Sequence, residues 1–518
     1  MGRRSRPNRI AATLLFLLLA CCQHEVEDPG RQTLTVVAPW KNKGPDPLIS
    51  GYLFVRMGCI ETLTGSDGHG GVEPRLAESW ELSRDMLTWN FTLRRGVRFH
   101  DGTPLTAEVA VHSLRRVFQQ HRLFAGSHAS IESIKPLGDR NILITTASPL
   151  SPLPAYLAHY ETAVIPPGSF TPDGRVSSVI GTGPYRLVSS KMDTLLEFEA
   201  FEDYWGKKPI AARARYFAIE SPDTRAMMAE SGEADLVLTL SSSSTELLRN
   251  SARVKVLSTV MPRLRILQVN TNLPFFDSEE ERRAFSLSID REKIARTLLG
   301  NPKMAASQLL PPTVEQWHDP GLKPLGFDPA EAERLLKRCG WKRGPDGVLQ
   351  KDGDRFVVEL ITYSSRPMLP VIAQALQAQL ERVGILLKIS VGQGAIIHQR
   401  HGDGSLQAAL YSHNFGLVPD AIGTIAFDFG PKPGRWGWGA MGWESEEMNL
   451  LIQQYLSTFD RAKAAEIRRK IVGLVQTELP LIPLTWYDHH AAMSKRIKGL
   501  KLDPYELRPY LEGVQWAD

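Results

Sequence analysis

Cysteine is scarce in this chain of 518 residues, which contains only Cys21, Cys22, Cys59 and Cys339. Cysteines so few and so far apart exclude a disulfide scaffold and a structural zinc cluster, and Cys59 and Cys339 are expected to be free thiols. The net charge is only +4, without the concentrated basic surface that binds nucleic acid. No apolar run reaches the ~20 residues of a transmembrane helix. With 42% hydrophobic residues, the chain is predicted to be globular, with two to four domains.

Catalytic and nucleotide-binding motifs are also missing from the sequence. It contains no HExxH, no GxSxG, no GxxxxGKS/T loop and no GxGxxG after a predicted strand. Gly181-Thr182-Gly183 lacks the third glycine and runs into Pro184, so it is not predicted to bind a nucleotide. The sequence therefore indicates a protein that is not an enzyme and uses no cofactor.

The first 20 residues have the three-part pattern of an export signal. Basic residues come first: Arg3, Arg4, Arg6 and Arg9. An apolar run over residues 10–20 follows, interrupted only by Thr13. As a helix this run rises about 16 Å, roughly half the thickness of a membrane core. Residues 1–20 are therefore predicted to be a signal peptide, and the protein is predicted to be exported to the periplasm or cell envelope.

The end of this segment, Leu18-Leu19-Ala20-Cys21, resembles the bacterial lipobox. The resemblance implies cleavage before Cys21 and attachment of lipid to that cysteine, with residues 21–32 as a polar tether. The alternative is an ordinary secretory signal in which Cys21 is incidental. Cleavage here removes four arginines from the 61 basic residues and leaves the 57 acidic ones. The mature chain then has no net charge, so the basic excess says nothing about a ligand.

Strand and helix patterns alternate along the rest of the chain. Residues 34–38 are rich in β-branched side chains and end at Pro39, which predicts a first strand. From 87 to 93 every second residue is apolar, as in a half-buried strand. Thr106 is suited to cap the helix predicted after it.

The second half of the chain shows the same alternation. Asp328 followed by Pro329 predicts a helix start, and Gly340 predicts its end. Residues 356–362, 372–383 and 385–389 have the patterns of a strand, a helix and a strand. A strand–helix–strand unit of this length indicates a crossover in an α/β layer.

A set of short motifs occurs in order along nearly the whole mature chain. The motifs lie in residues 74–108, in the GTGPY turn at 181–185, in 204–209, in 232–235, in 269–291 and in 328–341. Together they resemble the family 5 extracellular solute-binding proteins, the oligopeptide, dipeptide and nickel group of ABC importers. The glycine-rich turns among them are expected to need positive φ or a tight reversal and to identify the fold, not to bind ligand.

The resemblance implies an α/β fold with two lobes, of the class II periplasmic-binding-protein type, and an extra domain inserted in the first lobe. Carried over to this chain, lobe one comprises residues 33–56, 180–268 and 490–518. The inserted domain covers residues 57–179 and lobe two covers residues 269–489. A solute is expected to bind between the lobes, which close around it at a hinge.

The ligand segment of the family aligns with residues 411–420. The resemblance makes four of them candidate ligand contacts: Tyr411, Asn414, Phe415 and Asp420. Peptide-binding members usually carry an acid for the peptide's amino terminus three residues before Asp420, where this chain has Leu417. A buried ammonium without a partner costs several kcal/mol, so peptide binding requires another acid, and Asp420 is the candidate.

The same segment also resembles the nickel-chelate binders. Their aromatic and histidine contacts align with Phe415, Pro419 and about Pro433, and the arginine that clamps the chelate's carboxylates aligns near Tyr160. Only the aromatic residue at 415 is retained. A nickel or metal-chelate receptor is therefore an alternative to a receptor for peptide-like solutes.

A glycine-rich loop at residues 434–443 carries three tryptophans and an arginine. Arg435, Trp436 and Trp438 are candidate ligand contacts, because aromatic faces and a guanidinium suit a carboxylated or partly apolar organic solute. The alternative is that these tryptophans pack the loop onto lobe two.

The sequence thus predicts the solute-binding subunit of an ABC importer, which delivers its solute to a membrane permease and, through it, to ATPase subunits. Contact with the membrane is expected only through the lipid anchor, and no nucleic acid is expected as a partner. Two other functions stay open, a receptor that does not transport and, more remotely, a hydrolytic lipoprotein on the same fold. The pairs His398/His401 and His489/His490 lack further ligands at characteristic spacing, so no metal site is predicted.

Overall fold

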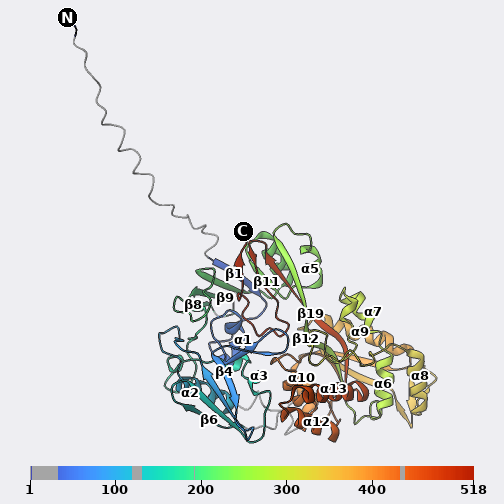
Figure 1. Ribbon diagram of the computed structural model, residues 1–518. Helices are drawn as coiled ribbons and strands as arrows, with labels where there is room; N and C mark the ends of the chain where they lie inside the picture. Colours follow the sequence, from blue (N-terminus) through green and yellow to red (C-terminus); the bar gives the residue numbers. More distant parts are fainter. Residues whose placement is uncertain (1, 3–32, 120–130, 192, 432–437, 518) are drawn as a thin grey trace.

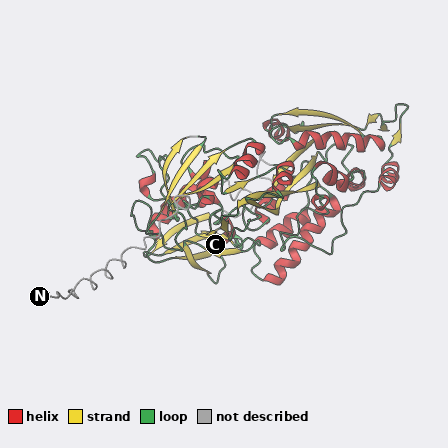
Figure 2. Cartoon of the chain, turned by 90° about the horizontal axis from the view of Figure 1, so that it is seen from above, coloured by secondary structure: helices red, strands yellow, loops and turns green. Residues whose placement is uncertain are grey.

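The computed structural model describes residues 2, 33–119, 131–191, 193–431 and 438–517. The predicted signal peptide and Cys21 lie outside these residues. Figure 1 shows two lobes, with strands β12 (Val254–Val269) and β19 (Leu481–Ser494) lying between them. Viewed from above, the second lobe is the richer in helix (Figure 2). The two-lobe α/β fold is therefore confirmed, while the exact lobe boundaries stay a prediction.

A single ten-stranded sheet extends through both lobes. Its strands are, in spatial order, β17 (Leu386–Gly392), β16 (Val357–Tyr363), β18 (Ala408–Asn414), β12, β19, β11 (Leu236–Leu238), β1 (Thr33–Ala38), β10 (Arg213–Ala218), β9 (Leu195–Ala200) and β8 (Tyr185–Lys191). Strands β12 and β19 are the fourth and fifth in this order, and the sheet passes from the strands of one lobe to those of the other through this pair.

The pairing of β12 with β19 is antiparallel but not continuous. Its register shifts between Met261 and Leu264, and again between Arg265 and Ile266. Pro262 lies within the first shift and has no N–H to donate to a ladder. Before the shift β12 pairs with the half of β19 that also contacts β11, and after it β12 pairs with β18 as well. The irregularity therefore coincides with the passage from one lobe to the other.

A second sheet, four-stranded and antiparallel, lies in the region predicted as the inserted domain. Its order is β4 (Ala77–Leu82), β5 (Thr88–Leu93), β7 (Asn141–Thr146) and β6 (Ile131–Leu137), and α2 (Ala107–Gln119) packs against β6 and β7. Along β5, buried Trp89, Phe91 and Leu93 alternate with half-buried polar residues. This agrees with the strand predicted from the apolar residue at every second position. The Thr106 hydroxyl accepts a hydrogen bond from the Val109 amide at 3.3 Å, which confirms the predicted cap.

The remaining elements complete the two lobes. In the first half of the chain and at its C-terminal end they are α1 (Pro47–Arg56), β2 (Thr64–Ser66), β3 (Val72–Pro74), α3 (Leu153–Tyr156), α4 (Pro222–Ser231), α5 (Ser242–Leu248), β20 (Ile497–Lys498), β21 (Gln515–Trp516) and the 3-10 turns Tyr160–Thr162 and Pro167–Ser169. In the second lobe they are α6 (Glu279–Leu287), α7 (Arg291–Leu298), the 3-10 turn Pro302–Met304, α8 (Pro329–Arg338), β13 (Lys342–Arg343), β14 (Leu349–Lys351), β15 (Asp354–Arg355), α9 (Met368–Arg382), α10 (Ala395–Gly402), α11 (Ile422–Phe429), α12 (Glu446–Leu456) and α13 (Arg461–Glu478).

Local signals in the second lobe are confirmed. The Asp328 side chain accepts a hydrogen bond from the Glu331 amide at 2.9 Å and caps α8. The helix is followed by Gly340, which has the predicted left-handed φ of +93°. Strands β16 and β17 are parallel and joined by α9, so the crossover unit is present. Cys59 and Cys339 are free thiols. No described helix is both long and apolar enough to cross a membrane.

The GTGPY turn requires its glycines for close packing and not for positive φ. Gly181 and Gly183 do not have positive φ. A Cβ on Gly181 would instead overlap the carbonyl of Cys59, and a Cβ on Gly183 would overlap the carbonyl of Gly58. The turn needs glycine because two backbone segments lie in direct contact there.

Gly181→Ala is expected to lower the free energy of unfolding by about 1–3 kcal/mol, because its methyl group meets a backbone carbonyl that cannot rotate away. The matched control is Gly392→Ala, whose Cβ would lie 3.7 Å from the nearest side-chain atom, on Ile396. Urea unfolding of both variants measures the effect. Equal stability of the two would show that the close packing at Gly181 is not a constraint.

Candidate functional site

Two of the predicted ligand contacts, Tyr411 and Phe415, are fully buried. Tyr411 lies in β18, its hydroxyl donates to the carbonyl of Trp438, and its ring stacks on that indole with the centroids 4.8 Å apart. Phe415 follows β18, its amide donates to the Pro262 carbonyl at 2.7 Å, and its ring stands edge-on to His413. Tyr411 thus joins β18 to the segment at Trp438, and Phe415 joins the end of β18 to β12. Contact of either residue with a ligand stays a prediction.

Asn414 and Asp420 shape the loop between β18 and α11. The Asn414 side chain accepts a hydrogen bond from the Gly416 amide at 3.1 Å. The Asp420 carboxylate accepts from the Trp317 indole at 2.9 Å, the Ile422 amide at 3.0 Å and the Tyr455 hydroxyl at 2.8 Å. Burial raises the pKa of Asp420, and these donors oppose that effect.

Asp420 also borders a polar cavity of about 560 Å³. One wall is formed by Asp67, Gly71, Val72, Ser151 and Pro152, and the other by Gln316, Asp420, Tyr455, Thr458, Phe459, Asp460, Arg461, Ala464 and Arg468. The first wall belongs to the predicted inserted domain and the second to predicted lobe two. The two walls meet directly, because Gln316 donates to the Gly70 carbonyl at 3.1 Å and the Ser151 amide to the Leu456 carbonyl at 2.7 Å.

Trp438 is half-buried against the second lobe. Its carbonyl accepts hydrogen bonds from Tyr411 and, at 3.0 Å, from the Gln268 side chain, and its indole lies against His398. The other two predicted contacts in this loop, Arg435 and Trp436, lie outside the described residues. Trp438 therefore packs against lobe two, as the alternative interpretation of this loop supposed.

The histidine pairs do not converge on a metal site. His398 contacts Trp438, whereas His490 lies 3.0 Å from Asp488 and hydrogen-bonds Ser258. Over the described residues, no three His, Cys, Asp or Glu side chains form a group that could hold a metal ion.

A cluster that the sequence analysis did not identify lies where β12 and β19 pass between the lobes. It contains four arginines, named here the hinge arginines: Arg56, Arg263, Arg265 and Arg366. Arg56 ends α1, Arg263 and Arg265 lie in β12, and Arg366 follows β16. Two arginines at alternate positions within a largely apolar run of β12, Pro262-Arg263-Leu264-Arg265-Ile266-Leu267, are the sequence signal that could have revealed it.

Glu506 faces two of the hinge arginines. Its carboxylate lies 3.4 Å from Arg56 and 3.8 Å from Arg263, and its carbonyl accepts from Arg56 Nε at 2.9 Å. Burial opposes ionisation of Glu506, but the nearby positive charges outweigh it and lower the pKa of this acid. Glu506 comes from the C-terminal segment, so first-lobe residues meet the joining strand at this point.

Aromatic rings complete the cluster on both sides. The guanidinium of Arg56 lies 4.8 Å from the ring of Trp40 and 5.9 Å from the ring of Tyr510. The guanidinium of Arg265 lies 3.8 Å from the ring of Tyr487 in β19. Aromatic rings with guanidinium groups beside them can bind an organic solute that has both apolar and anionic parts.

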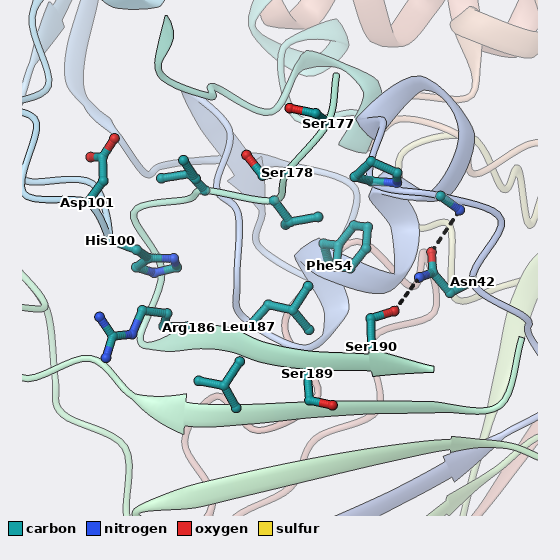
Figure 3. A pocket seen from close by; sticks show the side chains of 15 residues that line it. Asn42, Phe54, His100, Asp101, Ser177, Ser178, Arg186, Leu187, Ser189 and Ser190 are labelled. Carbon is teal, nitrogen blue, oxygen red and sulfur yellow. Dashed lines mark hydrogen bonds between the residues drawn. The ribbon is translucent and has the colours of Figure 1, made fainter. Parts of the chain in front are cut away.

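Another cavity, of about 440 Å³, lies on the first lobe and includes Asn42, Phe54, His100 and Ser190 (Figure 3). Three of its polar side chains, Asn42, His100 and Ser190, already have partners. Asn42 donates to Ser190 at 3.2 Å, and His100 Nε2 lies 2.9 Å from the Gly183 carbonyl. Burial lowers the pKa of His100 to about 4. None of its lining residues comes from the second lobe, so lobe closure does not act on it.

Phe415→Ala is expected to lower the stability of the solute-free protein by about 3–5 kcal/mol, because it removes a fully buried ring. Leu417→Ala is the matched control, since Leu417 lies two residues away and is 42% exposed. Thermal melting of both variants without solute measures the difference. An unchanged melting temperature for Phe415→Ala, with weaker solute binding, would instead assign the ring to the ligand.

Comparison with known proteins identifies the family. The profile of the bacterial extracellular solute-binding proteins, family 5, matches residues 71–434. The nickel-binding periplasmic protein of Escherichia coli is 28% identical over 497 residues, with 91% of this chain and 92% of that protein covered. Among solved structures, NikA from Brucella suis in complex with Fe(III)-EDTA has a TM-score of 0.84 at 24% identity and covers 95% of this chain and 100% of its own. The oligopeptide-binding protein AppA from Bacillus subtilis in complex with a nonapeptide has a TM-score of 0.76 at 20% identity, with 94% and 99% covered. The chain belongs to the family 5 extracellular solute-binding proteins.

Proposed function

We propose that this protein is the solute-binding subunit of an ABC importer and that it captures a peptide-like solute between its lobes. The observation that carries the proposal is the distribution of charge around the loop at residues 503–508. On one side, burial raises the pKa of Tyr505, and the nearby acids Asp420, Asp503 and Asp67 raise it further. On the other, Glu506 lies against Arg56 and Arg263.

A peptide-like solute has charges that match this arrangement. Its ammonium group can lie toward Asp420, in the cavity between the inserted domain and lobe two. Its carboxylate can lie toward the hinge arginines, which donate paired N–H groups that suit carboxylate oxygens. The family ligand segment lacks its usual acid at Leu417, and Asp420 is the acid that supports an ammonium here. Tyr411, Asn414, Phe415, Trp438 and the undescribed Arg435 and Trp436 remain candidates for the walls of this site.

Capture follows from closure about β12 and β19. A solute that contacts both lobes binds the closed form more tightly than the open form and shifts the population toward it. The permease can then recognise the loaded form by its shape, and no covalent chemistry is needed. We propose that export places the protein in the periplasm, where its relatives act, and that a lipid on Cys21 holds it at the membrane.

A metal chelate is the second candidate solute. It is favoured by the similarity to a nickel-binding periplasmic protein over 91% of the chain. The described residues offer no cluster of metal ligands, so the metal would arrive already bound to an organic carrier whose carboxylates face the arginines. A hydrolytic lipoprotein is a third possibility that no described side-chain arrangement favours.

Native mass spectrometry of the protein, purified without denaturation from its own host, tests the binding function. The expected result is a small organic solute that leaves intact when the protein is unfolded. A peptide would support the first candidate, and a chelate with its metal would support the second. Conversion of a bound peptide into fragments over time would contradict a binding protein and support a hydrolase.

Cys21→Ser is expected to move the protein from the membrane fraction to the soluble periplasmic fraction, because it removes the acceptor of the lipid. Cys22→Ser is the matched control and should stay with the membrane. Fractionation of cells followed by immunoblotting measures both. Release of neither variant, or of both, would contradict the lipid anchor at Cys21.

A further inference from the structure

We infer that one end of the first lobe, the end at which β1 begins, binds the surface of a membrane that contains anionic phospholipid. The inference rests on the proposed lipid anchor at Cys21. It adds a second membrane contact, made by the folded protein itself.

Several strands of the main sheet begin or end at this edge of the first lobe. Strands β1 and β10 are parallel, and their first residues, Thr33 and Arg213, lie side by side. Strand β19 ends here and is antiparallel to β11 and β12, so the starts of β11 and β12 lie beside it. Figure 1 shows β1, β11 and the C-terminus together at this end. Neighbouring strands lie about 4.8 Å apart, so the edge from β10 to β12 is roughly 20 Å wide.

Four exposed basic residues follow this edge. They are named here the basic edge: Arg213, Arg253, Lys255 and Lys495. The Lys495 amide donates to the Arg253 carbonyl at 2.8 Å, so these two residues adjoin. Arg496 then connects them to the start of β1, because its side chain donates to the Thr33 carbonyl at 3.1 Å. The basic residues therefore form a row across the edge of the sheet.

Acidic residues do not neutralise the basic edge. Over the part of the chain that the structure describes, none of its four members forms an ion pair with an acid. Arg253 and Lys495 donate to backbone carbonyls at 2.8 Å and 2.9 Å, which are neutral groups. Asp235, the buried acid at this edge, is already paired with Arg496. Glu233 is exposed nearby and offsets one of the four charges. Positive charge therefore faces solvent, where an external anionic surface can pair with it.

The predicted tether favours a membrane as the occupant of this edge. It consists of residues 21–32 and ends immediately before Thr33. A chain of this length spans at most about 40 Å, so a lipid on Cys21 keeps the start of β1 within that distance of the membrane. Tethering makes the second contact intramolecular, and a weak attraction is then enough to maintain it.

Exposed apolar side chains lie near the basic edge and also suit a membrane surface. Leu247, in the last turn of α5, is 80% exposed. Four residues later, the Ser251 carbonyl accepts a hydrogen bond from Lys495, which brings the end of α5 to the basic edge. Met227 is 64% exposed on α4, which packs against α5. Basic groups beside exposed apolar side chains bind the boundary between lipid headgroups and acyl chains.

A membrane contact at this edge is compatible with closure of the lobes. All four members of the basic edge belong to predicted lobe one. Strand β12 leaves the edge at Val254 and reaches its change of register only at Met261. The membrane therefore holds the first lobe, and the second lobe moves relative to it when a solute binds.

Vesicle binding tests the inference on the mature chain made without lipid, residues 22–518. The probes are vesicles of phosphatidylcholine alone and vesicles of equal parts phosphatidylcholine and phosphatidylglycerol, with bound protein measured by co-sedimentation. We expect at least about tenfold stronger binding to the anionic vesicles, because each basic residue near such a surface contributes about fivefold. Raising the salt from about 0.1 M to about 1 M should remove the difference, since the Debye length falls from about 10 Å to about 3 Å.

Paired substitutions separate the basic edge from the overall charge. Lys255→Gln combined with Lys495→Gln should weaken binding to the anionic vesicles at least about tenfold and leave the melting temperature unchanged, because both side chains are exposed. The matched control combines Lys293→Gln with Lys388→Gln. These two lysines are exposed in the second lobe and form no ion pair with a described residue. The control removes the same charge and should bind as the wild type does.

Two results would overturn the inference. The first is equal binding to the two kinds of vesicle, and the second is equal weakening by the two pairs of substitutions, which would assign binding to the overall charge. Native mass spectrometry of the co-purified solute keeps this inference separate from the proposed function. An intact solute in a protein that does not bind anionic vesicles would overturn the membrane contact and leave the solute-binding function standing.

Discussion

The hydrogen-bonded pair of β12 and β19 is the interaction on which the rest of the structure depends. These two strands belong to both lobes, and in the described part of the chain the main sheet continues from β11 to β18 through their ladder. The ladder changes register around Pro262, where the proline cannot donate a hydrogen bond. A change in register bends a strand and redirects side chains. The same feature thus separates the two lobes and directs Arg263 toward the C-terminal segment.

Much of this architecture could be predicted from local sequence patterns. The alternation along β5, the Asp328 cap of α8 and the crossover of β16, α9 and β17 follow from the positions of apolar, capping and glycine residues, which act within a few residues of each other. The glycines at 181 and 183 were recognised, but positive φ is not what requires them. Glycine is required there because the backbone packs against a chain segment more than 120 residues earlier. A local sequence pattern cannot predict a contact between such distant segments.

The candidate site was harder to predict, because its residues come from four separate parts of the chain. Arg56, Arg263, Arg366 and Glu506 become neighbours only when α1, β12, the end of β16 and the C-terminal loop are assembled. Alignment to the family drew attention to Tyr411 and Phe415, which carry structural contacts here. The departures from the family, Leu417 and Tyr160, were visible in the sequence, but the places of Asp420 and the hinge arginines in the fold were not.

The most direct test of this account is a crystal structure of the protein with the solute it retains from its host. The account predicts a solute between the lobes with a carboxylate group within hydrogen-bond distance of Arg263 or Arg366. A solute in the same region that contacts neither arginine, or one bound in the first-lobe cavity beside His100, would contradict it.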